Sequence, residues 1–190
     1  MRKNFGAKPW TYPQPVFIIA SYDENGTPDA MNAAWGGISD DKQISMCLSA
    51  GHKTVKNILA KKAFTVSMAT ARHVAECDYV GIESGNKVPD KLDRAFLHTE
   101  KAEFVDAPVI IELPMTVECK LVSYDPESMI MVGEIVNVSA DESVLTDGKI
   151  DPDKLRPITF DPVNNTYRVI GEVVGKAFSD GNRVKEEKYL

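Results

Sequence analysis

Short β-branched segments separated by turn residues constrain this chain more than any other feature of its sequence. Residues 16–20 are apolar at every position, which predicts a strand that is buried on both faces. The following pair Asn25-Gly26 tolerates the positive φ angles of a tight turn. The sequence therefore predicts a β-hairpin whose returning strand covers residues 28–35.

The same kind of reasoning extends along the chain. Further strands are predicted at residues 43–49, 63–69, 115–121, 129–138 and 167–174. Between the first two, residues 54–61 carry apolar side chains at helical spacing, with Thr54 as N-cap or first-turn residue. A second short helix is expected at residues 70–79, and residues 80–90 are rich in turn formers. Several short strands with few helices favour a mainly β fold, a β-barrel, over an alternating βαβ sheet.

Length and composition fit one folded domain. The chain has 190 residues, of which 43% are hydrophobic and 26% charged, as in ordinary globular proteins. We expect a single domain over residues 1–190, with an extended lead-in at residues 1–15 and a solvated tail at residues 179–190.

The net charge and the absence of targeting signals limit the expected partners and location of the protein. A net charge of -6 argues against nucleic acid as a partner, because phosphate neutralisation by basic side chains supplies most of that affinity. The first ten residues lack the apolar stretch of a signal peptide, and no apolar run approaches the ~20 residues that span a bilayer. We therefore expect a cytoplasmic protein without a membrane partner.

The three cysteines agree with a reducing compartment. Cys47, Cys77 and Cys119 are far apart and form no CxxC pair. Cys47 and Cys119 fall on strand patterns and are expected in the core, whereas the pattern leaves partial exposure of Cys77 open.

Familiar catalytic motifs are missing. The sequence has no GxGxxG after a strand, no GxxxxGK[ST] phosphate loop, no HExxH helix and no GxSxG elbow. The three histidines do not form ligand spacings with the cysteines, so no metal site is predicted.

The segment at residues 49–57 has the composition of an anion site. It joins a strand to a helix, so free backbone N–H groups and the positive end of the helix dipole favour a phosphate there. Ser49 and Thr54 add hydroxyl groups, and Lys53 adds a positive charge. Taken alone, the segment is better explained as an ordinary capped helix with solvated lysines.

Two other segments could complete such a site. Residues 31–37 place small side chains beside the amide of Asn32 and the indole of Trp35, an arrangement that lets a planar ring approach the backbone. Residues 84–91 form a Ser-Gly-Asn turn followed by Lys91. Taken alone, the first is better explained as a packed hairpin with Trp35 in the core, and the second as a polar surface loop.

In this order and spacing, the three segments resemble the FMN-binding split-barrel family of flavin reductase-like proteins, and most of all its flavoredoxin branch. The match also includes Lys8-Pro9-Trp10 and residues 171–178, so it covers nearly the whole chain. Each motif is weak by itself, and their order and spacing together are fairly specific.

The resemblance implies an FMN-binding split barrel and a homodimer with its FMN sites near the subunit interface. Carried over by position, the resemblance assigns contacts with the isoalloxazine ring to Asn32, Ala33, Ala34 and Trp35. It assigns the phosphate side to Ser49, His52, Lys53, Thr54 and Asn57. It assigns closure of the pocket to Ser84, Gly85 and Lys91. The last three residues are allowed to come from the neighbouring subunit. Many relatives carry Arg as the phosphate cation, and Lys53 is the nearest candidate here; Lys is a point charge rather than a bidentate fork.

The resulting expectation is an FMN-dependent oxidoreductase that passes electrons from a donor, NAD(P)H or a protein, to an acceptor. No catalytic side chain is predicted, because the chemistry belongs to the flavin. The alternatives are a reductase that uses free flavin as a substrate, a non-catalytic flavin- or haem-binding protein, and a scaffold dimer with an empty pocket. The sequence does not distinguish NADH from NADPH.

Overall fold

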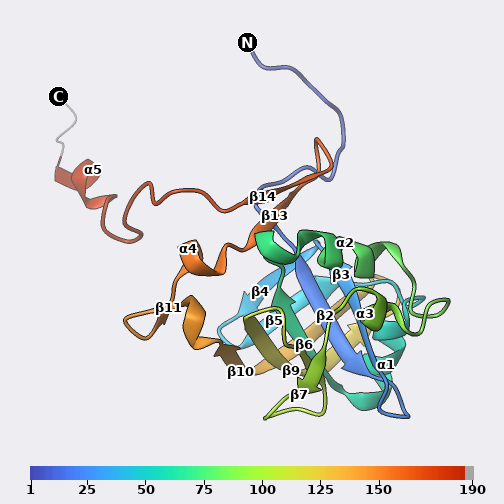
Figure 1. Cartoon of the computed structure of the whole chain (residues 1–190). Coiled ribbons are helices and arrows are strands. Elements are labelled where there is room, and N and C mark those ends of the chain that lie inside the picture. Colours follow the sequence, from blue (N-terminus) through green and yellow to red (C-terminus); the bar gives the residue numbers. More distant parts are fainter. Residues whose placement is uncertain (187–190) are drawn as a thin grey trace.

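The computed structural model describes residues 1–186, and one antiparallel sheet forms its centre. The strands are β2 (Phe17–Tyr22), β3 (Pro28–Ala33), β4 (Gly36–Asp40), β5 (Gln43–Cys47), β6 (Ala63–Met68), β9 (Met115–Asp125) and β10 (Ile130–Ala140). They pair in the order β3-β2-β6-β9-β10-β5-β4 and curl into a split barrel (Figure 1). The predicted fold class, mainly β with a few short helices, is confirmed.

Smaller sheets and helices surround the barrel. A three-stranded sheet contains β1 (Gln14–Pro15), β13 (Ile158–Asp161) and β14 (Thr166–Val169), and two short hairpins pair β7 (Thr99–Lys101) with β8 (Pro108–Ile110) and β11 (Leu145–Thr146) with β12 (Lys149–Ile150). The helices are α1 (Lys53–Lys61), α2 (Val74–Ile82), α3 (Lys91–Arg94), α4 (Pro152–Leu155) and α5 (Asn182–Glu186), with 3-10 turns at Ala71–His73 and Glu142–Val144. None of the helices within residues 1–186 has the length and apolar character needed to cross a membrane.

Strand β2 is buried on both faces because it lies between two hydrophobic cores. Phe17 and Ile19 point into one core, which α1 covers with Val55 and Ile58. Ile18 points to the opposite core, which also holds the buried apolar residues of α2 and α3. The alternation of side chains along a strand places successive apolar residues in different cores. This explains why residues 16–20 carry no polar position.

Most predicted elements are present with small shifts at their ends. The Asn25-Gly26 turn joins β2 to β3 in register, and α1, β5, β6, β9 and β10 lie where they were expected. Thr54 is a first-turn residue, and His52 is the N-cap. The second helix continues to Ile82, so the first part of residues 80–90 is helical rather than a turn.

Two boundaries were wrong. The returning strand of the hairpin ends at Ala33, and Gly36 begins a separate strand, β4, that pairs with β5. The last predicted strand ends at Val169 rather than at residue 174, because beyond this point the chain leaves β13, its pairing partner. The predicted solvated tail holds helix α5, and its last four residues lie outside the described part of the chain.

Two cysteine expectations also changed. Cys77 is fully buried, and Cys47 is half-buried rather than a core residue, whereas Cys119 lies in the core as predicted. Burial raises the pKa of Cys77 and of Cys119 to about 12. Both thiols therefore stay protonated and unreactive at neutral pH.

Candidate cofactor site

The first turn of α1 is open to an anion. The N-cap residue His52 has an extended backbone, its side chain makes no capping hydrogen bond, and the first turn contains no acidic residue. In most helices a side-chain oxygen satisfies some of these first N–H groups. An uncapped helix start with its positive dipole end is suited to a phosphate oxygen.

This helix start opens into a hollow of about 170 Å³ between β3, the end of α2 and the loop that follows it. Seven of the predicted site residues line it: Asn32, His52, Lys53, Thr54, Ser84, Gly85 and Lys91. The sequence-based grouping of three distant segments is therefore reproduced in space. One chain brings them together, so closure from a neighbouring subunit is not needed for these residues.

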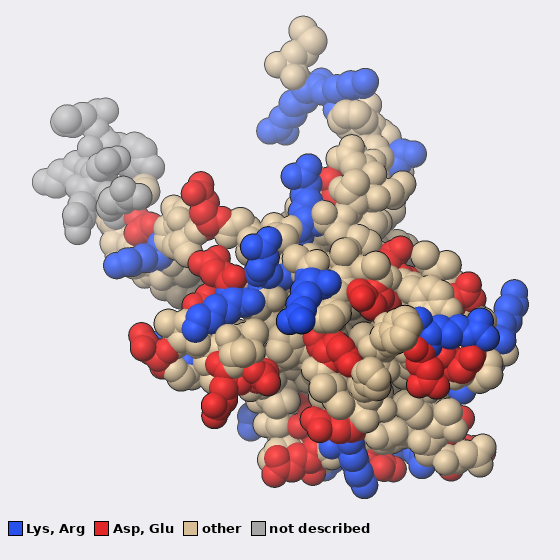
Figure 2. Space-filling model, viewed as in Figure 1, with Lys and Arg blue, Asp and Glu red and all other residues tan. Residues whose placement is uncertain are grey.

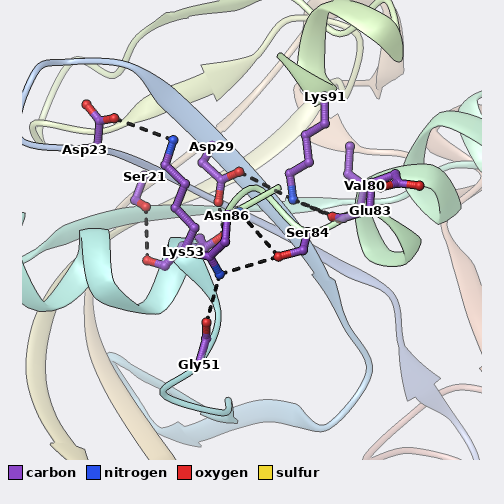
Figure 3. Close-up of polar contacts among 11 residues, drawn as sticks. Ser21, Asp23, Asp29, Gly51, Lys53, Val80, Glu83, Ser84, Asn86 and Lys91 are labelled. Atoms are coloured by element: carbon purple, nitrogen blue, oxygen red, sulfur yellow. Dashed lines mark hydrogen bonds and ion pairs between the residues drawn. The ribbon is translucent and has the colours of Figure 1, made fainter. Parts of the chain in front are cut away.

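Lys91 is buried and its ammonium group is fully engaged. Its Nζ donates to the carbonyl oxygens of Val80, at 3.2 Å, and Glu83, at 3.1 Å, and lies 3.4 Å from Oδ1 of Asp29 (Figure 3). Burial lowers the pKa of Lys91, although the charge of Asp29 acts in the opposite direction. Lys91 thus holds the wall of the hollow together rather than projecting a free charge into it.

Asp29 connects that wall to the helix start. Its second oxygen, Oδ2, accepts a 2.6 Å hydrogen bond from the hydroxyl of Thr54. The Thr54 hydroxyl is therefore committed to Asp29, which leaves backbone N–H groups as the donors that this turn offers to an anion. Gly85 approaches the same carboxylate so closely that a Cβ atom there would lie 2.1 Å from Oδ1 of Asp29.

Lys53 and the turn at Asn86 form the outer rim. The ammonium of Lys53 lies 3.6 Å from the carboxylate of Asp23, with one-sixth of its side chain exposed. The amide of Asn86 donates to the carbonyl of Gly51 at 3.0 Å and to the hydroxyl of Ser84 at 3.4 Å (Figure 3). These bonds tie the loop after α2 to the loop before α1, so both sides of the hollow are fixed.

A second hollow of about 330 Å³ lies next to the first. The two share Asn32, Gly81 and Ile82, and the second also contacts Ala34. Its far wall contains Phe160 and Tyr167, together with Asp78. The hydroxyl of Tyr167 donates to Asp78 at 2.6 Å, and burial together with this bond raises the pKa of the phenol.

Trp35 faces neither hollow. It is 56% exposed and lines an apolar groove of about 540 Å³ formed with β4, β5 and the lead-in segment. Ala34 borders both this groove and the second hollow. The alternative in which Trp35 packs in the core is therefore wrong.

Three other predicted residues lie apart from the hollows. Ala33 points to the opposite face of β3 and packs against the barrel core. Ser49 is exposed, and its hydroxyl lies 3.5 Å from the backbone nitrogen of Gly51. Asn57 is buried in α1, and its amide nitrogen has no hydrogen-bond partner within the described residues.

Several residues of the site were missed from the sequence. Asp29, the second residue of β3, is a charged residue that is only 1% exposed, and a carboxylate flanked by apolar positions is a signal for a buried partner. Asp78, Phe160 and Tyr167 carry no such local signal, because their meeting depends on how β13 and β14 fold back on α2.

Known proteins share this fold. The family described as flavin reductase like domain matches residues 10–158. Flavoredoxin of Desulfovibrio vulgaris (Miyazaki F) is 38% identical, with 95% of this chain and 100% of that chain covered and a TM-score of 0.91. Flavoredoxin from Methanosarcina acetivorans is 24% identical, covering 97% and 99% of the two chains, with a TM-score of 0.87.

The fold is also that of the FMN-binding domain of a flavin reductase-like enzyme from Shewanella baltica OS155. That structure is 20% identical, with 86% of this chain and 89% of that chain covered and a TM-score of 0.76. With the family match extending over most of the sequence, the chain belongs to the flavin reductase-like domain family.

Proposed function

We propose that this protein binds FMN and passes electrons through it, in the manner of a flavoredoxin. The observation that carries the proposal is the uncapped start of α1, which opens into a hollow that shares a wall with a second one. A phosphate at the helix start and a ring beyond Asn32 match the two ends of FMN in chemistry and in order.

The residues present fit this cofactor. The amide of Asn32 lies where the two hollows meet, so the phosphate end is assigned to His52, Lys53 and the backbone of Thr54. The ring is assigned to Asn32 and Ala34, with Trp35 beside them at the edge of the apolar groove. Bound FMN supplies one- or two-electron transfer, and the protein contributes binding, orientation and exclusion of water.

The proposal includes a homodimer with its FMN sites near the interface, and NAD(P)H or a protein as electron donor. Support for the first comes from the exposed apolar surfaces that border the second hollow at Ala34. A cytoplasmic location is proposed from the three free cysteines, which suit a reducing compartment.

Purified protein tests the proposal directly. We expect a yellow protein with one FMN per chain, whose visible absorbance bleaches anaerobically with NADH, NADPH or a reduced protein donor and returns when an acceptor is added. If no donor reduces the bound flavin, the protein is a non-catalytic flavin carrier. A Soret band would indicate bound haem instead of flavin. Either result would contradict electron transfer through FMN.

One observation favours a second candidate function, a reductase that uses flavin as an exchangeable substrate. The ammonium of Lys91 is committed to Asp29 and two carbonyl oxygens, and the ammonium of Lys53 is shared with Asp23, so the phosphate meets backbone donors and one partly neutralised charge. Loss of flavin during gel filtration, combined with NAD(P)H-dependent reduction of added FMN, would favour this reading over a permanently bound cofactor.

A further inference from the structure

A carboxylate lines the second hollow without a basic partner. Among the described residues that line this hollow, Asp78 of α2 is the only one with a charged side chain. No lysine, arginine or histidine side chain in the described part of the chain forms an ion pair with it. Its negative charge is therefore not neutralised by a neighbouring cation.

The phenol of Tyr167 fixes the place of this charge. Its hydroxyl, on β14, donates to Oδ1 of Asp78 on α2 at 2.6 Å (Figure 1). Burial and this bond raise the pKa of Tyr167, so the phenol keeps its proton and remains a donor at neutral pH. The ring of Phe160 packs against the phenol, with 6.1 Å between the ring centroids and a tilt of 53°. Tyr167 is therefore a positioning residue for the carboxylate.

Helix α2 is held against β3 on both sides of Asp78. Just before Asp78, the carbonyl oxygen of Cys77 accepts a 3.1 Å hydrogen bond from the amide of Asn32. One helical turn later, Gly81 approaches β3 so closely that a Cβ atom there would lie 2.8 Å from the Cβ of Asn32. The backbone at Asp78 is therefore fixed relative to Asn32, which borders both hollows.

The other charges of the protein act on this hollow less directly. The chain has a net charge of -6, but Figure 2 shows acidic and basic side chains interspersed over the visible face of the body. Solvent screens exposed charges beyond about 8 Å at physiological ionic strength, and it screens partly buried charges much less. Asp78 is half-buried. It is accordingly the negative charge that acts most strongly on the second hollow.

We propose that Asp78 lowers the reduction potential of bound FMN and that Tyr167 positions the carboxylate for this role. The inference rests on the proposed function, which assigns the flavin ring to Asn32 and Ala34 at the second hollow. Two-electron reduction at neutral pH adds two electrons and one proton, whether a hydride donor supplies them together or a protein donor supplies the electrons and water the proton. One negative charge is thereby added to the ring system, and a nearby carboxylate repels it without repelling the neutral, oxidised ring. Asp78 thus makes the bound flavin a stronger reductant, which suits passing electrons on to an acceptor.

The affinities for oxidised and reduced FMN test the inference. The Kd for oxidised FMN is measured in air, and the Kd for FMN reduced with dithionite is measured anaerobically. Asp78→Asn keeps the shape of the side chain and an oxygen that can accept from Tyr167, so only the charge is lost. We expect the ratio of the oxidised to the reduced Kd to rise about tenfold in this variant, which for a two-electron couple is an increase of about 30 mV in potential. An unchanged ratio would overturn the inference.

Two further variants separate the charge at Asp78 from net charge and from packing. Glu76→Gln removes one negative charge from the same helix, but Glu76 pairs with His73 and lines neither hollow, so we expect the wild-type ratio. Asp78→Glu retains the charge, and its potential should lie closer to that of the wild type than to that of Asp78→Asn. If Glu76→Gln raised the potential as much as Asp78→Asn, or if Asp78→Glu behaved like Asp78→Asn, the local charge would not be the cause and the inference would fail.

A double-variant comparison tests the role of Tyr167. Tyr167→Phe removes the hydrogen bond and leaves the carboxylate free to turn toward solvent, so we expect a smaller rise in potential than in Asp78→Asn. In the Asp78→Asn background the same change should add nothing, because no charge is left to position. Additive shifts in the two variants would refute the positioning role.

The same titrations separate this inference from the proposed function. A wild type that binds FMN and is reduced by a donor, with the same potential in Asp78→Asn, would leave the function standing and refute the inference alone. A wild type that binds no FMN in either oxidation state would refute both.

Discussion

The ammonium of Lys91 lies 3.4 Å from the carboxylate of Asp29, and the two side chains are only 3% and 2% exposed. The pair joins the start of α3 to strand β3, and Asp29 in turn holds Thr54 at the start of α1. Three segments that are distant in sequence thus meet at one buried ion pair. Lys91 is accordingly a positioning residue for the candidate site rather than a direct ligand.

Removal of Lys91 should destabilise the fold strongly. Lys91→Met leaves Asp29 as an uncompensated buried charge, which costs about 3–5 kcal/mol of unfolding free energy, as measured by urea denaturation. The matched control is Lys53→Met, which breaks the more exposed pair with Asp23 and should cost at most about 1 kcal/mol. Equal losses in the two variants would argue against a special role for the buried pair.

A methyl group at Gly85 should disturb the same cluster. The Cβ of Gly85→Ala would lie 2.1 Å from Asp29, whose carboxylate is already held by two partners. We expect a loss of about 1–3 kcal/mol and weaker FMN binding, measured by thermal unfolding and by flavin fluorescence. Gly37→Ala is the control, since its Cβ meets nothing within 4 Å; if both behave alike, the packing argument fails.

Lys53 should distinguish FMN from riboflavin. Lys53→Ala removes a positive charge beside the start of α1, a contact worth roughly 1.5–3 kcal/mol to a phosphate, so FMN should bind about tenfold or more weakly. Riboflavin lacks the phosphate and should bind as it does to the wild type. Lys61→Ala, at the other end of α1, serves as the control. If Lys53→Ala weakened the binding of FMN and of riboflavin equally, the assignment of the phosphate to this helix start would be wrong.

Asp161 should make stability depend on acid pH. Hydrogen bonds from Asn164 and then Tyr12 hold the pKa of Asp161 well below its usual range. The unfolded chain therefore takes up the proton first, so this stabilisation is present above pH ~4 and is lost as the pH falls further. Asp161→Asn should show a smaller drop in melting temperature between pH 7 and pH 3 than the wild type. The exposed Asp153→Asn should retain the full drop.

The parts of the fold that could be predicted depend on short-range patterns. Asn25-Gly26 specifies its turn through local backbone geometry, and residues 54–61 show helical spacing without any tertiary information. Strand β4 was missed because Gly36 and Gly37 read as the end of the preceding strand. It pairs with β5 through the tight turn at Asp41 and Lys42, a local signal that the sequence-based prediction did not use.

In the candidate site, too, the sequence predicted what depends on local patterns and missed what depends on the tertiary fold. The grouping of the three segments was predicted from their order, and seven of the twelve named residues line the first hollow. The orientation of individual groups was not predictable, because Lys91 and Asp29 are separated by 62 positions and no local pattern points to their contact. The exposure of Trp35 likewise depends on the break between β3 and β4.

Calorimetric titration of the flavin-free protein with FMN, and separately with riboflavin, tests the central claim most directly. If the start of α1 holds the phosphate, FMN binds once per chain and at least about tenfold more tightly than riboflavin, as one charge-assisted contact requires. Equal affinity for the two flavins, or no binding of FMN, would contradict the account.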